Sequence, residues 1–219
     1  WISIDPNRTA EVDSAGIREV RAIGAEDIDL PESSVDAVFS CNALQFIDVE
    51  RTMPHIRRIL APGGLFFAHF GPIWSGVDGH QLEYVEYQGR SLGFWKDTFV
   101  PPWGHLMYDP PELKAVLASA LPDELADLIV HHTFVSSTIN RMFFEDYIDV
   151  ALDSGLEWVV VKATNTLDYS IETPNYDSEL LKPVDIERLE ERIERKRGRK
   201  TKLGPRDIFM VLRKRASTL

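Results

Sequence analysis

The order of segments between residues 35 and 70 constrains the fold of this chain more than any other feature. Residues 35–40 are short and largely apolar, as expected for a strand of a parallel sheet that is covered on both faces. Asp48 can then cap a helix, and residues 62–64, Pro-Gly-Gly, stop it because proline cannot continue a helix and glycine tolerates positive φ. Residues 65–70 form the next strand. This order predicts a parallel strand–helix–strand unit.

Helices and strands alternate along much of the remaining chain, which favours a doubly wound α/β fold. Further strands are expected at 2–4, 17–23, 156–163 and 207–213, and helices at 110–120, 122–130, 143–154 and 184–197. Residues 71–112 show no clear helical or strand period but are rich in aromatic side chains, so we expect a functional lid there and not disorder. The last two strands suit an antiparallel pair that closes the sheet.

The composition narrows the range of partners. The 219 residues include 35 acidic and 24 basic side chains, giving a net charge of −11 and a pI near 5.0. A global attraction to nucleic acid or anionic lipid is therefore not expected, and a small-molecule substrate fits better. The single cysteine, Cys41, excludes an internal disulfide, and no apolar run approaches the ~20 residues of a membrane helix. We expect a cytoplasmic protein without a membrane segment.

Acidic residues follow two of the expected strands, where a doubly wound sheet binds its ligands. Asp5 comes directly after the first, and its carboxylate can accept hydrogen bonds from both hydroxyls of a ribose. The alternative is a turn-forming aspartate before Pro6. Glu26 and Asp27 follow the second strand, just before Leu30-Pro31, and taken alone they would be a solvated surface turn.

In this order and spacing, Asp5, Glu26 to Pro31, the turn at 40–48 and Pro62-Gly63-Gly64 resemble the nucleoside half of class I S-adenosylmethionine (SAM) dependent methyltransferases of type 11. The resemblance implies a Rossmann-like, doubly wound, mostly parallel sheet with a helical or loop cap inserted after the fifth strand. Residues 26–31 are similar to the family's Asp-Ala-x-x-Leu-Pro segment. Glu26 or Asp27 would then accept from the adenine amino group, with Ile28 beside it among the contacts.

The resemblance also covers the turn after the fourth strand, where Cys41 and Asn42 would line the cofactor and Phe46 takes a place often held by histidine. One part of the family's site has no counterpart, because no Gly-x-Gly occurs anywhere in the sequence and the chain opens on what would be strand two.

Three histidines are candidates for the base that removes a proton from the methyl acceptor, namely His69, His80 and His105, because they precede or lie in the insert. A structural role on a lid carbonyl or against a tryptophan is the alternative for each. No short metal-ligand spacing appears, so no metal is expected. Cys41 lacks an activating base and is more simply a small apolar residue after a buried strand.

Two other groups of side chains leave alternatives open. Aromatic residues of the insert form either an apolar wall over a ring-bearing or lipophilic acceptor or simply its small core; they are Trp74, Tyr84, Tyr87, Phe94, Trp95, Phe99 and Trp103. The basic run at 192–202 could touch a phosphate chain, but nearby glutamates neutralise much of it, which favours a solvated helix over RNA binding.

The sequence therefore predicts a SAM-binding core at 1–70, a cap for substrate at 71–155, and sheet-completing strands at 156–219 with an exposed charged helix at about 184–197. The expected activity is methyl transfer to an oxygen or nitrogen of a small, aromatic or lipophilic metabolite. The alternative is a catalytically silent methyltransferase-like partner subunit; a homodimer or a partner subunit fits either hypothesis.

Overall fold

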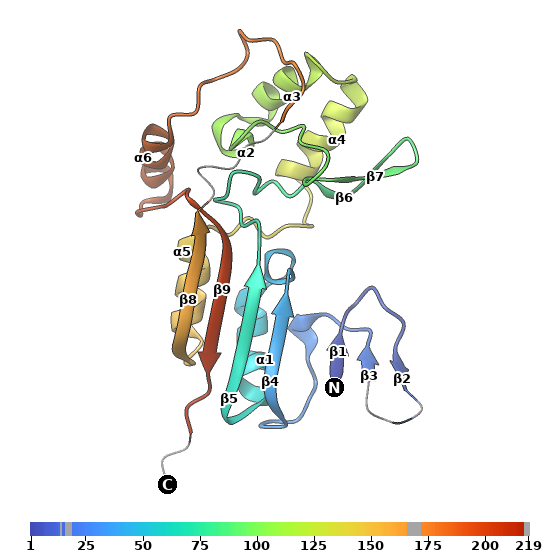
Figure 1. Ribbon diagram of the computed structural model, residues 1–219, viewed down its shortest axis with the longest axis vertical. Coiled ribbons are helices and arrows are strands. Elements are labelled where there is room, and N and C mark those ends of the chain that lie inside the picture. The colour runs from blue at the N-terminus through green and yellow to red at the C-terminus, as the bar shows by residue number, and fades with distance from the viewer. Residues whose placement is uncertain (14, 16–18, 166–171, 217–219) are drawn as a thin grey trace. The chain divides into compact units, whose positions relative to one another are not determined.

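The computed structural model describes residues 1–13, 15, 19–165 and 172–216 (Figure 1). The chain divides into two compact units. Unit 1 consists of residues 1–69, 147–161 and 209–219, and unit 2 consists of residues 70–146 and 162–208. The division differs from the expected ranges because residues 147–155 pack in unit 1 and residues 162–208 pack in unit 2.

Unit 1 begins with a small sheet in the order β1-β3-β2. Its strands are β1 (Ile2–Ile4), β2 (Glu11–Val12) and β3 (Glu19–Arg21). β1 and β3 are parallel, and β2 runs antiparallel to β3. The strand expected at 17–23 is confirmed for residues 19–21, while residues 17 and 18 lie outside the described part of the chain.

A four-stranded sheet follows in the order β4-β5-β9-β8. Its strands are β4 (Val35–Cys41), β5 (Leu60–Phe70), β8 (Glu157–Asn165) and β9 (Pro205–Arg213). β4 and β5 are parallel, and β8 and β9 run in opposite directions (Figure 1), as expected for the two last strands. The parallel strand–helix–strand unit and the α/β fold class predicted from the sequence are thereby confirmed.

Two helices lie on one face of this sheet, α1 (Val49–Ile59) and α5 (Phe144–Asp153) (Figure 1). Asp48 caps α1 as expected, with its Oδ1 accepting from the backbone N–H of Arg51 at 3.0 Å. The helix ends at Ile59, and β5 already begins at Leu60, five residues before the expected start. The Pro-Gly-Gly turn thus lies inside the first part of β5, where Gly63 takes a φ of 83°.

The expectation that residues 35–40 are covered on both faces is wrong. Phe39 is 62% exposed, and β4 bonds to β5 on one side and to no other strand among the described residues. The Phe39 ring stacks on Phe67 at 4.8 Å and on Trp1 at 6.3 Å between centroids. β4 and β1 therefore both present an open edge within the described chain.

Unit 2 contains a hairpin and four helices. They are β6 (Glu83–Tyr87), β7 (Arg90–Gly93), α2 (Gly104–Met107), α3 (Pro110–Ala118), α4 (Asp123–Phe134) and α6 (Ile186–Arg197). The expectation of no regular structure at 71–112 is wrong, because Gln88 and Gly89 both take positive φ and close the two-residue turn of the hairpin. Buried side chains such as Leu82, Leu113 and Ile129 form the core of this unit.

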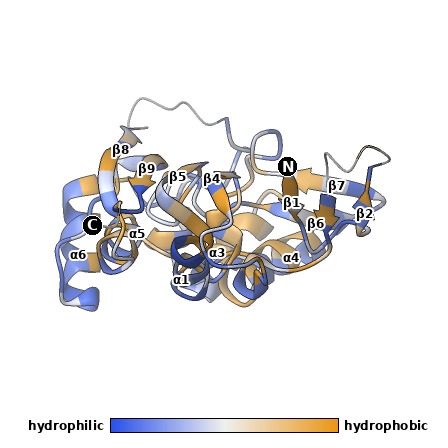
Figure 2. Ribbon diagram, turned by 90° about the horizontal axis from the view of Figure 1, so that it is seen from below, coloured by the Kyte–Doolittle hydropathy of each residue, from blue (hydrophilic) through white to orange (hydrophobic). Residues whose placement is uncertain are grey.

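None of the described helices combines the length and apolar composition needed to cross a bilayer. Figure 2, coloured by hydropathy, shows that α6 is mainly hydrophilic. Only Leu189 and Ile193 of α6 are buried, as expected for an exposed charged helix.

Candidate functional site

The loop that follows β3 carries the acidic residues that were expected to bind adenosine. It begins with the short helix η1 (Ala25–Asp27). Glu26 Oε1 accepts from the backbone N–H of Asp48 at 2.8 Å, so the carboxylate of Glu26 reaches the residue that caps α1. A Cβ on Gly24 would lie 2.7 Å from Glu26 Oε2, so a side chain there would displace the end of the Glu26 side chain. Glu26 therefore already has a backbone partner.

Asp27 and Ile28 present different groups from the same loop. The Asp27 side chain is 70% exposed, and its nearest described cation is Arg51, at 3.7 Å between Oδ1 and Nη2. Ile28 buries its side chain with Leu30 and Ile59. The backbone N–H of Ile28 lies at the C-cap of η1, next to the Asp27 carboxylate in sequence. An exposed carboxylate and an adjacent backbone N–H are the acceptor and donor that the edge of an adenine ring requires.

Asp5 lies immediately after β1, as the sequence predicted. Its Oδ1 accepts from the backbone N–H of Asn7 at 2.9 Å, which is the turn expected of an aspartate before proline. Its Oδ2 meets the exposed Arg8 guanidinium at 3.6 Å, longer than a hydrogen bond. The turn therefore occupies one carboxylate oxygen directly and leaves the second with a weak, solvated partner.

Cys41, Asn42 and His69 come together at the carboxyl ends of two parallel strands. Cys41 faces His69 in the register of β4 and β5, and the backbone N–H of Asn42 donates to the carbonyl of His69 at 2.8 Å. Asn42 takes a φ of 47°, which turns the chain sharply after β4. Cys41 is exposed at the end of β4, and no residue of β4 is fully buried, so the expectation that it follows a buried strand is wrong. The sulfur lies at the edge strand and not inside the sheet.

His69 is exposed, and its ring lies edge-on to Phe209 at 6.3 Å between centroids. His80 and His105 belong to unit 2, where both are buried and their rings lie 5.8 Å apart. The three candidate bases are therefore divided between the units.

Burial changes what His80 and His105 can do. Desolvation lowers the pKa of His105 to about 4, although the carbonyl of Trp74 accepts from its Nε2 at 2.8 Å. Desolvation, with the neighbouring His105 and His132, holds the pKa of His80 well below its usual range. His80 Nδ1 accepts from the backbone N–H of Leu82 at 3.1 Å. Both imidazoles are thus neutral and bonded to the backbone, which is the structural alternative weighed for them.

No pattern in the sequence points to the third histidine of this cluster, His132. His132 of α4 donates from Nε2 to the carbonyl of Gln81 at 2.7 Å and meets that of His80 at 3.1 Å. It comes from a helix more than fifty residues away in sequence, so only the folded chain reveals the grouping. The described residues contain no set of three or more histidine, cysteine or acidic side chains arranged to hold a metal.

The aromatic residues of the insert are mostly core. Trp103 is buried in the core of unit 2, and its Nε1 donates to the carbonyl of Ser75 at 3.1 Å. Tyr87, Phe94 and Phe99 pack against the same core. Trp95 is the exception at 58% exposed, and the side chain of Tyr84 lies outside the described part.

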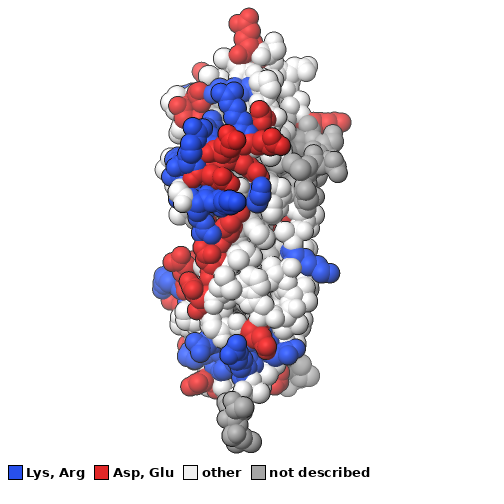
Figure 3. All heavy atoms as spheres, turned by 90° about the vertical axis from the view of Figure 1, so that its left-hand side faces the viewer, with Lys and Arg blue, Asp and Glu red and all other residues white. Residues whose placement is uncertain are grey.

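The basic run at 192–202 is neutralised locally. Arg197 pairs with Glu145 and Asp146, and Lys202 pairs with Glu190. Figure 3 shows acidic and basic side chains interleaved over the face that carries α6. This arrangement supports the solvated-helix interpretation.

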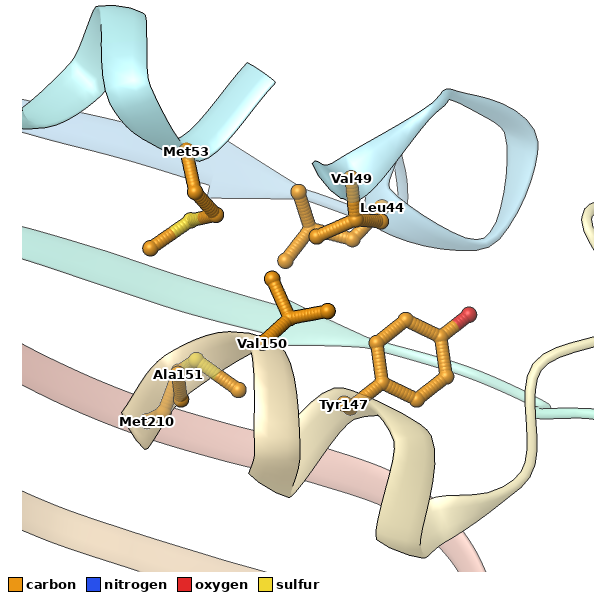
Figure 4. A pocket seen from close by; sticks show the side chains of 7 residues that line it. All are labelled: Leu44, Val49, Met53, Tyr147, Val150, Ala151 and Met210. Atoms are coloured by element: carbon orange, nitrogen blue, oxygen red, sulfur yellow. The ribbon is translucent and has the colours of Figure 1, made fainter. Parts of the chain in front are cut away.

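The hollow drawn in Figure 4 lies inside unit 1 between α1, α5 and β9. It is lined by Leu44, Val49, Met53, Tyr147, Val150, Ala151 and Met210. The lining is almost entirely carbon and sulfur, and the space is too small for a substrate. It is a small packing gap between the two helices and the sheet.

Comparison with known proteins agrees with this geometry. Residues 2–68 match the profile of the methyltransferase domain family. An uncharacterized methyltransferase of Mycobacterium tuberculosis is 36% identical over 69 residues, which are 32% of this chain and 26% of that protein. The chain thus aligns with about a quarter of the length of the curated relatives it matches. The resemblance to class I SAM-dependent methyltransferases is confirmed for residues 2–68.

Solved structures are similar more distantly. A SAM-dependent methyltransferase of Mesorhizobium loti is 14% identical with a TM-score of 0.45, over 97% of this chain and 79% of that chain. Geranyl diphosphate C-methyltransferase of Streptomyces coelicolor is 14% identical with a TM-score of 0.42, over 90% and 54% of the two chains.

Proposed function

We propose that this protein is a SAM-dependent methyltransferase that transfers a methyl group to an oxygen or nitrogen of a small aromatic or lipophilic metabolite. The observation that carries the proposal is the loop at 26–28, which presents the exposed Asp27 carboxylate beside the backbone N–H of Ile28 and lies inside the matched segment. When bound, SAM supplies an electrophilic methyl group and needs no covalent step on the protein.

The loop separates the roles of its two acids. We assign the adenine amino group to Asp27, because its side chain is exposed and its partner is a distant, solvated arginine. The N–H of Ile28 then donates to an adenine ring nitrogen. Glu26 holds the loop in place by accepting a hydrogen bond from the N–H of Asp48, and it therefore affects SAM binding indirectly.

Asp5 is the proposed ribose ligand. Its Oδ2 is the oxygen available for a hydroxyl, since Oδ1 holds the turn at Asn7. One charge-assisted hydrogen bond, donated by a ribose hydroxyl to Oδ2, is enough to orient the sugar. Cys41 and Asn42, at the end of β4, are assigned to the same ligand on the side nearer His69.

We assign the base to His69. It is exposed at the carboxyl end of β5, beside Cys41, whereas His80 and His105 are buried and have lowered pKa values. Its imidazole would take the proton that an oxygen or nitrogen acceptor loses as the methyl group arrives. Unit 2, which holds most of the proposed cap at 71–155, would select the acceptor. Trp95 is its exposed aromatic side chain.

We also infer that activity requires a strand and a glycine-rich loop that these 219 residues do not contain. The sequence lacks Gly-x-Gly, and among the described residues β1 and β4 each have an open edge. Ile4 of β1 and Val38 of β4 pack against the apolar cluster that contains Ile28. A strand seated there would cover this cluster and the exposed side of β4. This requirement holds whichever polypeptide carries that strand.

Calorimetric titration with S-adenosylhomocysteine tests the proposal, using the protein as its gene encodes it. We expect binding that weakens on Asp27→Ala and on Glu26→Ala but not on Glu187→Ala, a control on the surface of α6. No heat at high micromolar ligand would overturn the cofactor assignment, and equal affinities in all three variants would overturn the loop assignment. Binding without methyl transfer to any phenol, carboxylic acid or amine would favour a silent partner subunit.

The base is tested separately. Because positioned proton transfer contributes about 10²–10⁴-fold to a rate, we expect His69→Gln to lower kcat/KM by at least 10²-fold while S-adenosylhomocysteine still binds. His131→Gln, an exposed histidine of α4, is the control. Unchanged kcat/KM in His69→Gln would refute this assignment.

A further inference from the structure

Helical periodicity would place Arg58 on the outer face of α1, but its side chain turns back to the loop that precedes β4. Its Nη2 donates to the carbonyl of Ile28 at 2.8 Å, and its Nη1 donates to the carbonyl of Leu30. One guanidinium thus spans two alternate carbonyls of the loop that carries Asp27. Lysine has a single ammonium and cannot reproduce this fork.

The backbone of the same helix end fixes the next part of the loop. The N–H of Ser33 donates to the carbonyl of Arg58 at 2.9 Å, and the N–H of Ser34 donates to that of Ile59 at 2.8 Å. Lys214 donates to the carbonyl of Leu60 at 2.7 Å, after the end of β9. Side chain and backbone of Arg58 therefore both hold residues 28–33.

The orientation of Ile28 follows from these contacts. Its side chain is held in the apolar cluster with Leu30 and Ile59, and its carbonyl is held by Arg58. With two of the substituents at its Cα held, the backbone nitrogen is placed, and the direction of the N–H follows from the φ of −58° at Ile28. Asp29 is tied separately to Arg21 of β3, so the loop is also held on its other side.

We infer that Arg58 is a positioning residue, which sets the direction of the Ile28 N–H and the place of Asp27 so that the loop distinguishes adenine from other purines. The inference rests on the proposed SAM-binding function. Arg58 touches neither cofactor nor substrate in this assignment and acts through the loop.

The choice of ligand separates positioning from general stabilisation. S-adenosylhomocysteine carries an amino group and an unprotonated ring nitrogen, whereas S-inosylhomocysteine carries a carbonyl and a ring N–H at those places. An accurately placed Asp27 and Ile28 N–H therefore favour the adenine compound, because the inosine compound leaves both without a partner. A merely destabilised protein would lose affinity for both ligands equally.

The experiment measures both affinities by calorimetry in the wild type, Arg58→Lys and Arg58→Gln, with thermal melting of each. We expect the Arg58 variants to bind S-adenosylhomocysteine about tenfold more weakly, as one lost charged hydrogen bond implies, and their preference over the inosine compound to fall by a similar factor. Arg57→Lys is the matched control, since the Arg57 guanidinium lies beside Gly155 and not at the loop.

The outcomes are distinct. A wild type that binds neither compound overturns the proposed function together with this inference. A wild type that prefers adenine, with variants that keep both affinity and preference, overturns only the role of Arg58. Variants that weaken equally for both compounds show a structural role and also overturn it. Arg58→Gln retains two amide donors, so it supplies a second folded variant if Arg58→Lys melts too early to measure.

Discussion

The two units use their charged and titratable side chains in opposite ways. In unit 1, the acids of the loop at 26–28 lie at the surface. The loop is held by hydrogen bonds that the side chains of Glu26 and Arg58 make to backbone groups. In unit 2, Asp78, His80 and His105 are each at most 3% exposed. A polar side chain at the surface can serve a ligand, whereas a buried one must first satisfy the fold.

The difference teaches which histidines are useful. All three candidates looked equivalent in the sequence, but of the three only His69 is exposed to solvent. The buried pair instead bonds to the backbone of the insert at Trp74 and Leu82. Burial, and not residue type, divides the candidates.

The largest expected effect is at the buried ion pair of unit 2. Arg206 binds Asp78 with its Nη2 2.8 Å from Oδ2, and Asp78 is 3% exposed. Asp78→Ala removes the buried carboxylate but leaves Arg206 its contact with Asp207 at 2.9 Å, so it should lower the free energy of unfolding by about 3 kcal/mol, the lower end for a broken buried pair. Denaturant unfolding measures it.

The control for Asp78 is an exposed pair in the same unit. Asp127→Ala removes the carboxylate that meets Lys114, and both side chains of that pair are solvated. We expect no measurable change in its midpoint. Similar losses in the two variants would contradict the contrast between buried and exposed charges.

The next effect is acid sensitivity of unit 2. The pKa of His105 is lowered to about 4 by burial, while an unfolded histidine titrates near 6.5. As the pH falls below about 6.5, the unfolded chain binds a proton that the folded chain refuses, so stability falls with pH down to about 4. For His105 alone the loss amounts to about 3 kcal/mol.

The measurement is the unfolding midpoint between pH 7 and pH 4, followed by tryptophan fluorescence because Trp74 contacts His105. His105→Gln cannot take up the proton, and its amide can still donate to the carbonyl of Trp74. Its stability should therefore depend less on pH in this window. His80 and His132 belong to the same cluster and add to the remaining slope, while Arg141 stays charged over this range and acts on His132 as a fixed positive charge. An unchanged slope would refute the role of His105.

Local sequence predicted much of unit 1 and one helix of unit 2. The cap at Asp48, the parallel pair β4 and β5 and the exposed helix α6 all follow from patterns within a few residues. These features depend mainly on residues that are close in sequence, so they can be predicted from local patterns.

Long-range packing determined the rest. Helical periodicity alone would place Arg58 outward, because it cannot show a guanidinium folding back to a loop thirty residues earlier. The exposure of Phe39 and Cys41 depends on what packs against β4 and cannot be inferred from the apolar residues of β4 alone. The hairpin at 83–93 was missed because its turn, Gln88-Gly89, lacks the usual asparagine or aspartate.

The smallest effect separates the two acids of the loop. Glu26 bonds to the backbone N–H of Asp48 at the start of α1, so Glu26→Ala should lower the free energy of unfolding by about 1 kcal/mol and weaken S-adenosylhomocysteine binding as well. Asp27→Ala should weaken binding with no loss of stability, because the only described ion pair of Asp27 is solvated and 3.7 Å long. Paired melting and calorimetry measure both quantities. If Asp27→Ala lost stability and Glu26→Ala did not, the acids would have to exchange roles, and Glu26 would be the one that meets adenine.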